Sequence, residues 1–348
     1  MELAATFDVA IVGGGVIGCQ IARHLMMTRP ELSIAIFDRE RIGFGCSAYA
    51  GAIISPICLS EQHEQATGIA IDHYHQLLAE QPHGTPWLRS LPVVMVASQS
   101  NVAAMKSKVP AALTEVTHEQ LPEWFSLPQD HQAFTGATAY QADVLTACMN
   151  AVNHPAIKRY ECVTVTERHQ LHNNDWQLTL ADQRQVQCKS LIMATGPWTV
   201  HDAALKGTSA AISELDTKKI AAWFVDHPAR TDSPLIYLYD HGAFLLPLPM
   251  QNQWLMSITA NEWGISPSRE QLHLNQTEHQ QAMALLTQYC PSLTGSLRGG
   301  RAHCDGYLPQ RLPTITQDSN QIFAVGGSGS GFRYAPWIAR QVADAIRP

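Results

Sequence analysis

Three glycines near the start of the chain have the spacing of a turn that binds a dinucleotide. Gly13, Gly15 and Gly18 directly follow the apolar run Val9–Val12, and an amphipathic stretch predicts a helix over Val16–Met27. Gly13 makes the turn, a side chain at Gly15 would block a pyrophosphate, and Gly18 lets the helix pack closely on the strand. The helix N-terminus presents unpaired N–H groups and a positive dipole end to the phosphates.

An acidic residue follows at the distance expected for contact with a ribose. A second apolar strand, Ser33–Phe37, ends at Asp38, twenty residues after Gly18. A carboxylate at this position accepts a hydrogen bond from a ribose hydroxyl. It disfavours the 2′-phosphate of NADP, so the sequence favours NAD or FAD.

Three further segments bring small residues to places where bare backbone can approach a flat ligand. Residues 45–51 form a loop of small and hydroxyl residues, and the buried strand 190–193 ends in Ala194-Thr195-Gly196. Near the C-terminus, the apolar run 321–325 leads into the glycine loop 326–331, and a helix is predicted from Trp337 to Ile346. That last unit would direct a helix dipole toward a redox ring, where reduction builds negative charge.

The composition describes a globular protein with room for two domains. The chain has 348 residues, of which 45% are hydrophobic and 15% are charged. A net charge of −7 and a pI near 6.1 give no electrostatic indication of a nucleic-acid partner or an anionic membrane. No apolar run is long enough to span a bilayer, and no signal peptide is recognised, so we expect a cytoplasmic protein.

The cysteines and histidines do not predict a metal site. Eight cysteines lie far apart without a C-x-x-C pair, which favours reduced thiols over a zinc or dithiol centre. The 16 histidines include no H-E-x-x-H spacing.

Periodicity predicts the remaining elements. The middle of the chain alternates helices with short strands, and residues after 220 favour an antiparallel sheet. Helices are predicted within 61–78, as pieces within 102–125, over 144–152 and within 271–289, and strands over 91–97, 137–143, 160–166, 176–180, 186–193, 220–225, 235–239, 243–247 and 253–259.

Together the motifs resemble the D-amino-acid oxidase-like flavoproteins, the family that includes glycine oxidase and sarcosine oxidase. The resemblance rests on four blocks, namely 13–18 with Asp38, 45–51, 194–198 and 326–336. It implies an α/β plus α+β fold, with a discontinuous Rossmann-like FAD-binding domain and a second domain built on an antiparallel sheet. The expected boundaries are 1–83, 138–213 and 298–348 for the FAD-binding domain, and 84–137 and 214–297 for the substrate domain.

The resemblance also implies a noncovalent FAD, although Cys46 offers an alternative point of covalent attachment. Val163 matches the position whose backbone contacts the adenine. The expected cofactor contacts are Gly13, Gly15, Val16, Ile17, Gly18, Asp38, Arg39, Cys46, Ser47, Ala50, Gly51, Val163, Ala194, Thr195, Gly196, Trp198, Gly327, Gly329, Gly331 and Phe332.

The reaction implied by the resemblance is oxidation of a C–N bond in a small amino acid or secondary amine. A hydride passes from the carbon next to nitrogen to flavin N5, the imine hydrolyses, and dioxygen commonly reoxidises the flavin to give peroxide. Such chemistry depends on orientation more than on a protein base. Three alternatives stay open: a dehydrogenase with another acceptor, a tRNA-modification oxidase, and a flavin-binding sensor without activity.

An arginine is expected to hold the substrate carboxylate, since a guanidinium can make a two-pronged contact with it. Arg301 is the first candidate, but extra residues between Asp305-Gly306 and Leu312-Pro313 leave the register open to Arg298 or Arg311. Arg333, in the closing glycine loop, is a further candidate for facing substrate or flavin. Tyr239 and His241 precede a strand of the predicted substrate sheet and are expected to line the pocket.

Overall fold

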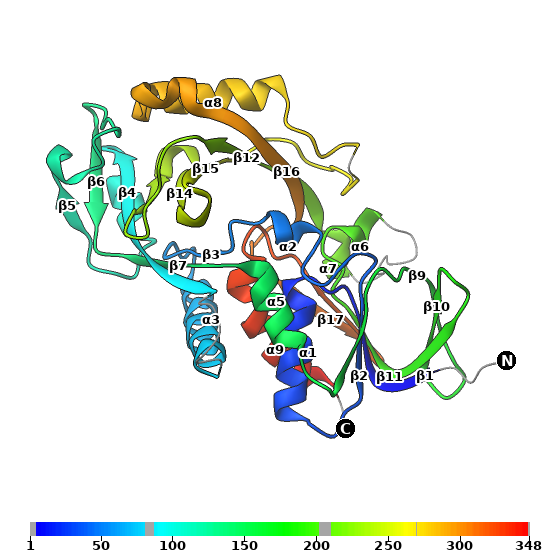
Figure 1. Cartoon of the computed structure of the whole chain (residues 1–348). Coiled ribbons are helices and arrows are strands. Elements are labelled where there is room, and N and C mark those ends of the chain that lie inside the picture. The colour runs from blue at the N-terminus through cyan, green and yellow to red at the C-terminus, as the bar shows by residue number, and fades with distance from the viewer. Residues whose placement is uncertain (1–4, 81–86, 202–209, 269, 347–348) are drawn as a thin grey trace.

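The computed structural model describes residues 5–80, 87–201, 210–268 and 270–346 (Figure 1). They form a mixed α/β protein with two sheets, as the sequence predicts. The helices are α1 (Val16–Thr28), α2 (Cys46–Tyr49), α3 (Glu61–Ala79), α4 (Val102–Lys106), α5 (Val144–Val152), α6 (Trp198–His201), α7 (Ala210–Ser213), α8 (Gln276–Tyr289) and α9 (Gly331–Ala345), with short 3-10 turns η1 (His118–Gln120), η2 (Tyr239–His241), η3 (Pro249–Gln251) and η4 (Pro291–Ser296).

The first sheet is mainly parallel and holds the dinucleotide-binding motif. Its strands are β1 (Ala5–Val12), β2 (Ile34–Phe37), β8 (Ile157–Tyr160), β9 (Val165–Gln170), β10 (Trp176–Leu180), β11 (Gln185–Met193), β17 (Thr314–Asp318) and β18 (Gln321–Val325). They run in the order β17-β18-β11-β1-β2-β8, and the β9–β10 hairpin extends from β11. Val9–Val12 is buried on both faces, which explains why this strand is continuously apolar. Figure 1 shows α1, α5 and α9 packed together beside this sheet.

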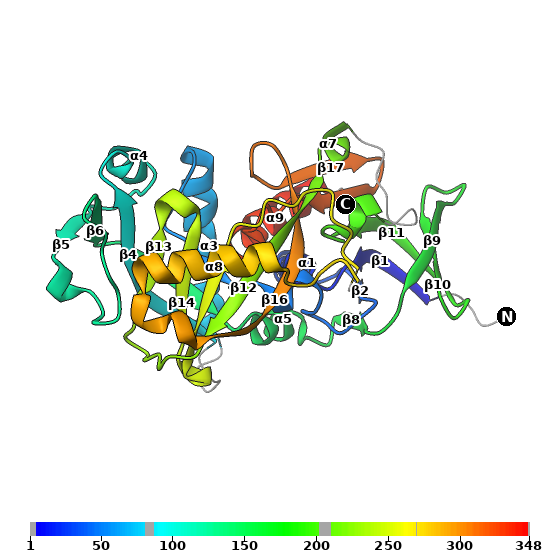
Figure 2. The same ribbon diagram turned by 90° about the horizontal axis from the view of Figure 1, so that it is seen from above.

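The second sheet is larger and mainly antiparallel. Its strands are β3 (Ile53–Ile54), β4 (Leu88–Ser98), β5 (Thr114–Val116), β6 (His131–Thr135), β7 (Thr138–Ala142), β12 (Asp216–Val225), β13 (Leu235–Leu238), β14 (Ala243–Leu248), β15 (Gln253–Ile258) and β16 (Leu297–Tyr307). The order is β16-β12-β15-β14-β13-β4-β6-β5, with β3 and β7 attached through β4, and only β13 and β4 pair in parallel among its described strands. Figure 2 shows α8 lying across strands of this sheet.

Strand pairing bears on the predicted domain boundaries. All strands of the first sheet fall within the segments predicted for the FAD-binding domain. Strand β16 starts at Leu297, however, and pairs along its length with β12 of the second sheet. Strands β3 and β7 also join the second sheet, through β4. The division into domains remains a prediction, but these pairings favour a boundary after Tyr307 instead of before Arg298.

Two local predictions need correction. Residues 102–125 contain one short helix, α4, and then strand β5 and turn η1, because Thr114–Val116 pairs with β6. The strand predicted over 160–166 is divided, since β8 ends at Tyr160 and β9 begins at Val165.

The last helix begins earlier than predicted. Helix α9 starts at Gly331 and contains Pro336, although a proline inside a helix leaves the carbonyl four residues before it without a donor. That carbonyl belongs to Phe332, and the Tyr74 hydroxyl of α3 donates to it at 2.8 Å. The Tyr74 ring also stacks on the Phe332 ring at 4.4 Å. Helix α3 therefore replaces the hydrogen bond that Pro336 removes.

No helix in the described ranges is long and apolar enough to cross a membrane.

A buried ion pair attaches α8 to the second sheet. The Lys219 ammonium of β12 lies 2.8 Å from Glu278 and 3.2 Å from Glu262, and Lys219 and Glu278 are 1% and 2% exposed. Glu278 also forms a capping box with Asn275, in which each side chain accepts from the other residue's backbone N–H.

Lys219→Met should lower the free energy of unfolding by about 3–5 kcal/mol, because Glu278 is left buried without its counter-charge. Urea unfolding followed by circular dichroism measures the change. Lys189→Met is the matched control, since that ammonium pairs with Asp8 at the surface and its loss should matter little. Equal effects of the two changes would contradict the assignment of α8 attachment to this pair.

Candidate active site

A cavity of about 690 Å³ is lined by both sheets. On one side it is bounded by the glycine turn after β1, the ends of β2 and β11, the loop around α2, and the turn before α9. On the other side, residues of β12, β13, β14 and β15 close it. Segments from both ends of the chain therefore meet in one cavity.

The first glycine turn has no room for side chains. Gly13 has φ +108°, and a Cβ there would lie 2.3 Å from the Ala194 carbonyl oxygen. A Cβ on Gly18 would lie 1.9 Å from the Gly13 carbonyl oxygen. The Gly15 position is crowded only by the Ser47 hydroxyl, at 3.1 Å. Backbone at Gly13 and Gly15 is therefore presented directly to the cavity.

Asp38 is fixed beside this turn at the end of β2. One carboxylate oxygen accepts from the Gly14 backbone N–H and the other from the Glu40 N–H, both at 2.7 Å. Burial raises the pKa of Asp38, and these two hydrogen bonds partly oppose that change. Since each oxygen has a further lone pair, the carboxylate can still accept from a ribose hydroxyl.

The residues after β11 and β2 form a flat region at the same end of the cavity. The Arg39 guanidinium lies 4.1 Å from the centre of the Trp198 ring. The Val163 N–H donates to the Asp38 carbonyl at 2.8 Å, so Val163 is held against the same wall. Planar groups and backbone at this end suit an adenine.

Every residue predicted to contact the cofactor lines this cavity except Gly18, which lies behind the turn. The lining residues of that set are Gly13, Gly15, Val16, Ile17, Asp38, Arg39, Cys46, Ser47, Ala50, Gly51, Val163, Ala194, Thr195, Gly196, Trp198, Gly327, Gly329, Gly331 and Phe332.

The second glycine turn provides a second crowded backbone surface. Gly326 has φ +83°, and a Cβ there would lie 2.4 Å from the Leu308 side chain. Gly329 has φ +76°, and a Cβ would lie 2.7 Å from the Tyr307 hydroxyl. Two such turns and an acidic ribose site along one cavity fit an extended flat dinucleotide such as FAD.

Arg333 lines the same cavity from the first turns of α9 and is only 6% exposed. One terminal nitrogen donates to the carbonyls of Ser55 and Ile57, and the other to the hydroxyls of Ser330 and Tyr334, at 2.7–3.2 Å. The Nε–H has no partner in the described part of the chain. Among the described residues, no carboxylate lies within ion-pair distance of this guanidinium.

The other candidate arginines occupy three different positions. Arg301 lines a neighbouring cavity of about 920 Å³ and donates to the Ala50 carbonyl at 3.2 Å. Arg298 is at the surface, 3.5 Å from Asp226. Arg311 lines the main cavity from an exposed position. The first candidate of the sequence, Arg301, is therefore outside the main cavity lining, because α2 and Ala50 cover that part of β16.

Tyr239 lines the cavity, and its hydroxyl accepts a hydrogen bond from the Lys108 ammonium at 2.8 Å. The same ammonium lies 5.2 Å from the centre of the Tyr239 ring. Lys108 lines the cavity too, although nothing in its local sequence indicates this.

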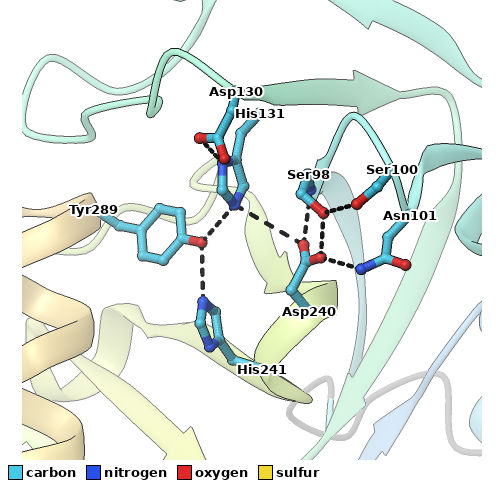
Figure 3. A network of polar contacts seen from close by, with 8 residues as sticks. All are labelled: Ser98, Ser100, Asn101, Asp130, His131, Asp240, His241 and Tyr289. Carbon is cyan, nitrogen blue, oxygen red and sulfur yellow. Dashed lines mark hydrogen bonds and ion pairs between the residues drawn. The ribbon is translucent and has the colours of Figure 1, made fainter.

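The turn that carries Tyr239 is held by Asp240. This carboxylate accepts from the Ser98 N–H at 2.8 Å, and from the Ser98 hydroxyl and the Asn101 amide at 2.5 Å (Figure 3). Burial alone would raise the pKa of Asp240, but these hydrogen bonds and nearby His131 lower it below its ordinary value. Asp240 is therefore ionised and has its oxygens occupied.

His241 takes part in the same network instead of lining the cavity. It hydrogen-bonds with the Tyr289 hydroxyl at 3.1 Å, and His131 contacts that hydroxyl at 3.0 Å (Figure 3). Tyr289 is 1% exposed, so this network connects η2 to the end of α8.

The sequence interpretation missed a row of polar residues on β16. His303, Asp305 and Tyr307 alternate along the strand and all line the main cavity. Burial raises the pKa of Asp305 to about 6 and lowers the pKa of His303 to about 3, where the charge of Arg301 also contributes. The polar residues at every second position from Arg301 to Tyr307 could have indicated this row in the sequence. In the described chain, no group of His, Cys, Asp and Glu residues could hold a metal ion.

Gly18→Ala should abolish cofactor binding, because the new methyl group collides with the Gly13 carbonyl and displaces the turn. The flavin absorbance of the purified protein measures this. Gly68→Ala is the matched control, since Gly68 is also helical but its Cβ would meet nothing within 4 Å. This control should keep the cofactor and gain about 0.5–1 kcal/mol in stability. Full cofactor content in Gly18→Ala would contradict the packing argument.

Asp305→Asn should stabilise the protein in a pH-dependent way. The folded protein binds the Asp305 proton more tightly than the unfolded chain, whose carboxyl titrates near 3.8, so wild-type stability is lost as the pH rises from about 4 to about 6. The variant should gain about 1–3 kcal/mol above pH 6 and little at pH 4, measured by urea unfolding at each pH. A gain that does not vary with pH would contradict this titration.

Solved structures share the fold over almost the whole chain. Glycine oxidase from Geobacillus kaustophilus superposes with a TM-score of 0.77 at 16% identity, covering 98% of this chain and 94% of that one. L-proline dehydrogenase from P. horikoshii gives a TM-score of 0.79 at 17% identity, covering 99% and 94%.

Among curated proteins, the mitochondrial pyruvate dehydrogenase phosphatase regulatory subunit of Mus musculus is 23% identical over 214 residues. The match covers 57% of this chain and 24% of the mouse protein, so the chain spans about a quarter of that relative's length. The model of the FAD dependent oxidoreductase family (DAO) matches residues 8–345. The chain therefore belongs to the DAO family of FAD-dependent oxidoreductases, enzymes whose cofactor is FAD.

Proposed function

We propose that the protein oxidises the C–N bond of a small amino acid or secondary amine that carries a carboxylate. The observation that carries this proposal is Arg333, a buried cation on the cavity wall without a carboxylate partner in the described residues. A buried charge is costly unless it is paired, and the charge of Arg333 would attract a ligand carboxylate into the cavity. The two solved structures that share the fold are named for amino-acid substrates, which supports the same class.

The residues around Arg333 would orient the substrate. The guanidinium is held by four hydrogen bonds to neighbouring carbonyls and hydroxyls, so its direction is set before a ligand arrives. Bound FAD would supply a two-electron acceptor for the hydride on the carbon next to nitrogen. Ala222, Leu255 and Phe244 form an apolar part of the wall that excludes water from that carbon.

Asp305 is the group best suited to receive a proton from the substrate. A substrate amine must lose its ammonium proton before it can release a hydride. Because burial raises the pKa of Asp305 to about 6, this carboxyl can take up such a proton near neutral pH more readily than an ordinary aspartate.

We further propose dioxygen as the electron acceptor, with peroxide as product, and a cytoplasmic location. The eight cysteines are all free thiols, which supports a reducing compartment. A dehydrogenase with another acceptor, a tRNA-modification oxidase and a flavin-binding sensor are the competing functions, and the net charge of −7 disfavours the RNA substrate.

Anaerobic mixing of the purified holoenzyme with small amines should bleach the flavin absorbance only when the amine carries a carboxylate. Readmitted air should restore the absorbance and produce peroxide if the enzyme is an oxidase. Reduction that requires an added acceptor would indicate the dehydrogenase, and flavin that no amine reduces would overturn the proposed reaction.

Arg333→Met should raise the substrate concentration for half-maximal reduction about 100-fold, the loss expected for a hydrogen-bonded charge pair. Arg333→Lys should recover part of the loss, because it restores the charge without the four hydrogen bonds that fix the guanidinium. Arg298→Met and Arg301→Met serve as controls and should change this concentration little, since both lie outside the main cavity lining. If only Arg301→Met has a large effect, Arg301 instead of Arg333 contacts the carboxylate.

A further inference from the structure

We propose that the substrate carries a second acidic group, which Lys108 and Tyr239 bind at the far side of the segment 55–58 from Arg333. The inference rests on the proposed function, because it treats Arg333 as the contact of the first carboxylate. It narrows the substrate class to amines with two acidic groups separated by a short aliphatic chain.

The charge inventory of the cavity supports a second anion. Lys108 is half-buried and lines the cavity, and its ammonium has a phenol as partner instead of a carboxylate. Within the described ranges, no Asp or Glu lies at ion-pair distance from Lys108 or from Arg333. The nearby acid Asp240 is already occupied by Ser98 and Asn101. Arg39 and the exposed Arg311 line other parts of the cavity, and Asp305 is on β16. Lys108 and Arg333 are therefore two further lining cations that lie outside ion-pair distance of every described carboxylate.

Arg333 and the backbone of Lys108 are bonded to opposite sides of one peptide group. The Arg333 guanidinium donates to the carbonyls of Ser55 and Ile57. The next residue, Cys58, donates its N–H to the Lys108 carbonyl at 2.7 Å. Because the C=O and N–H of the trans peptide Ile57–Cys58 point in opposite directions, the Arg333 guanidinium and the Lys108 backbone are held on opposite sides of the segment 55–58.

A tyrosine lies near each of these two cations. Tyr237 of β13 and Tyr239, the first residue of η2, both line the cavity. Burial raises the pKa of Tyr237, while contacts with Ser55 and Arg333 oppose this, so Tyr237 belongs to the Arg333 end. Tyr239 belongs to the Lys108 end. Since one peptide group separates Arg333 from the Lys108 backbone, a linker of a few methylene groups would let two acidic groups reach both cations.

The contact between Lys108 and Tyr239 is suited to an anion. The ammonium donates to the Tyr239 oxygen, so the phenol hydrogen is free to donate elsewhere. The ammonium has two further hydrogens. Both groups can therefore donate to one carboxylate, while Ile57 and Phe244 of the cavity lining contact the aliphatic linker.

Binding of dicarboxylates to the oxidised holoenzyme tests this without turnover. Succinate, glutarate and adipate are compared with butyrate, valerate and hexanoate, and the shift of the flavin absorbance gives each dissociation constant. At least one diacid should bind about 10–100-fold more tightly than the monoacid of equal length. Lys108→Met should remove this preference and leave monoacid affinity unchanged, whereas Lys108→Arg should retain it.

Lys106→Met is the matched control, because Lys106 is exposed, contacts the Phe134 ring at 4.2 Å and does not line the cavity. It should behave as the wild type. Lys108→Gln provides a second neutral variant if Lys108→Met loses its flavin. Equal affinity for diacids and monoacids in the wild type would overturn the inference, as would an equal loss of both in Lys108→Met.

Failure of this inference differs from failure of the proposed function. If carboxylated amines reduce the flavin but diacids show no preference, the second subsite is wrong and the C–N oxidation stands. If diacids bind in a way that depends on Lys108 but no amine reduces the flavin, the subsite stands and the reaction is wrong. Matched amine substrates, glutamate against norvaline and 2-aminoadipate against norleucine, extend the same comparison to reduction.

Discussion

One backbone contact positions the elements around the first glycine turn. In this contact, Gly18 of α1 lies against the Gly13 carbonyl at the end of β1. Only a helix without a side chain there can lie so close to the strand. That closeness brings the Gly14 N–H to Asp38 and the Val16 N–H to the Ser47 hydroxyl, at 2.7 and 3.0 Å. Strand β1, helix α1, strand β2 and the α2 loop are thus positioned by one backbone contact.

The proposed substrate site is built differently, from side chains on separate elements. Arg333 comes from α9, Lys108 follows α4, and Tyr239 comes from η2. Their relative positions depend on the segment 55–58 and on the network around Asp240 (Figure 3). In such a site a substitution can alter one ligand contact and leave the others in place, whereas the glycine turns tolerate almost no substitution.

This difference explains what the sequence could predict. The sequence could predict many residues that line the cavity, because they belong to local patterns: glycine turns, an acid at a strand end and small residues after β11. The position of Arg301 beside the neighbouring cavity could not be predicted from the sequence, because it depends on how α2 and Ala50 cover β16. Lys108 carries no local signal, since its place in the cavity lining depends on contacts with segments far away in sequence, such as the bond from the Cys58 N–H to its carbonyl. The start of α9 was missed because Tyr74, far away in sequence, compensates for Pro336.

That compensation also affects how the enzyme can diverge. Arg333 lies between Phe332 and Pro336, in the turn of α9 whose missing hydrogen bond is supplied by α3. The direction of the arginine is therefore partly set by a helix that does not belong to the glycine loop. Substitutions on the buried face of α3 can shift Arg333 by small amounts, while the two glycine turns stay unchanged. Substitutions in helix α3 could therefore change the proposed substrate preference during evolution without lowering the affinity for the cofactor.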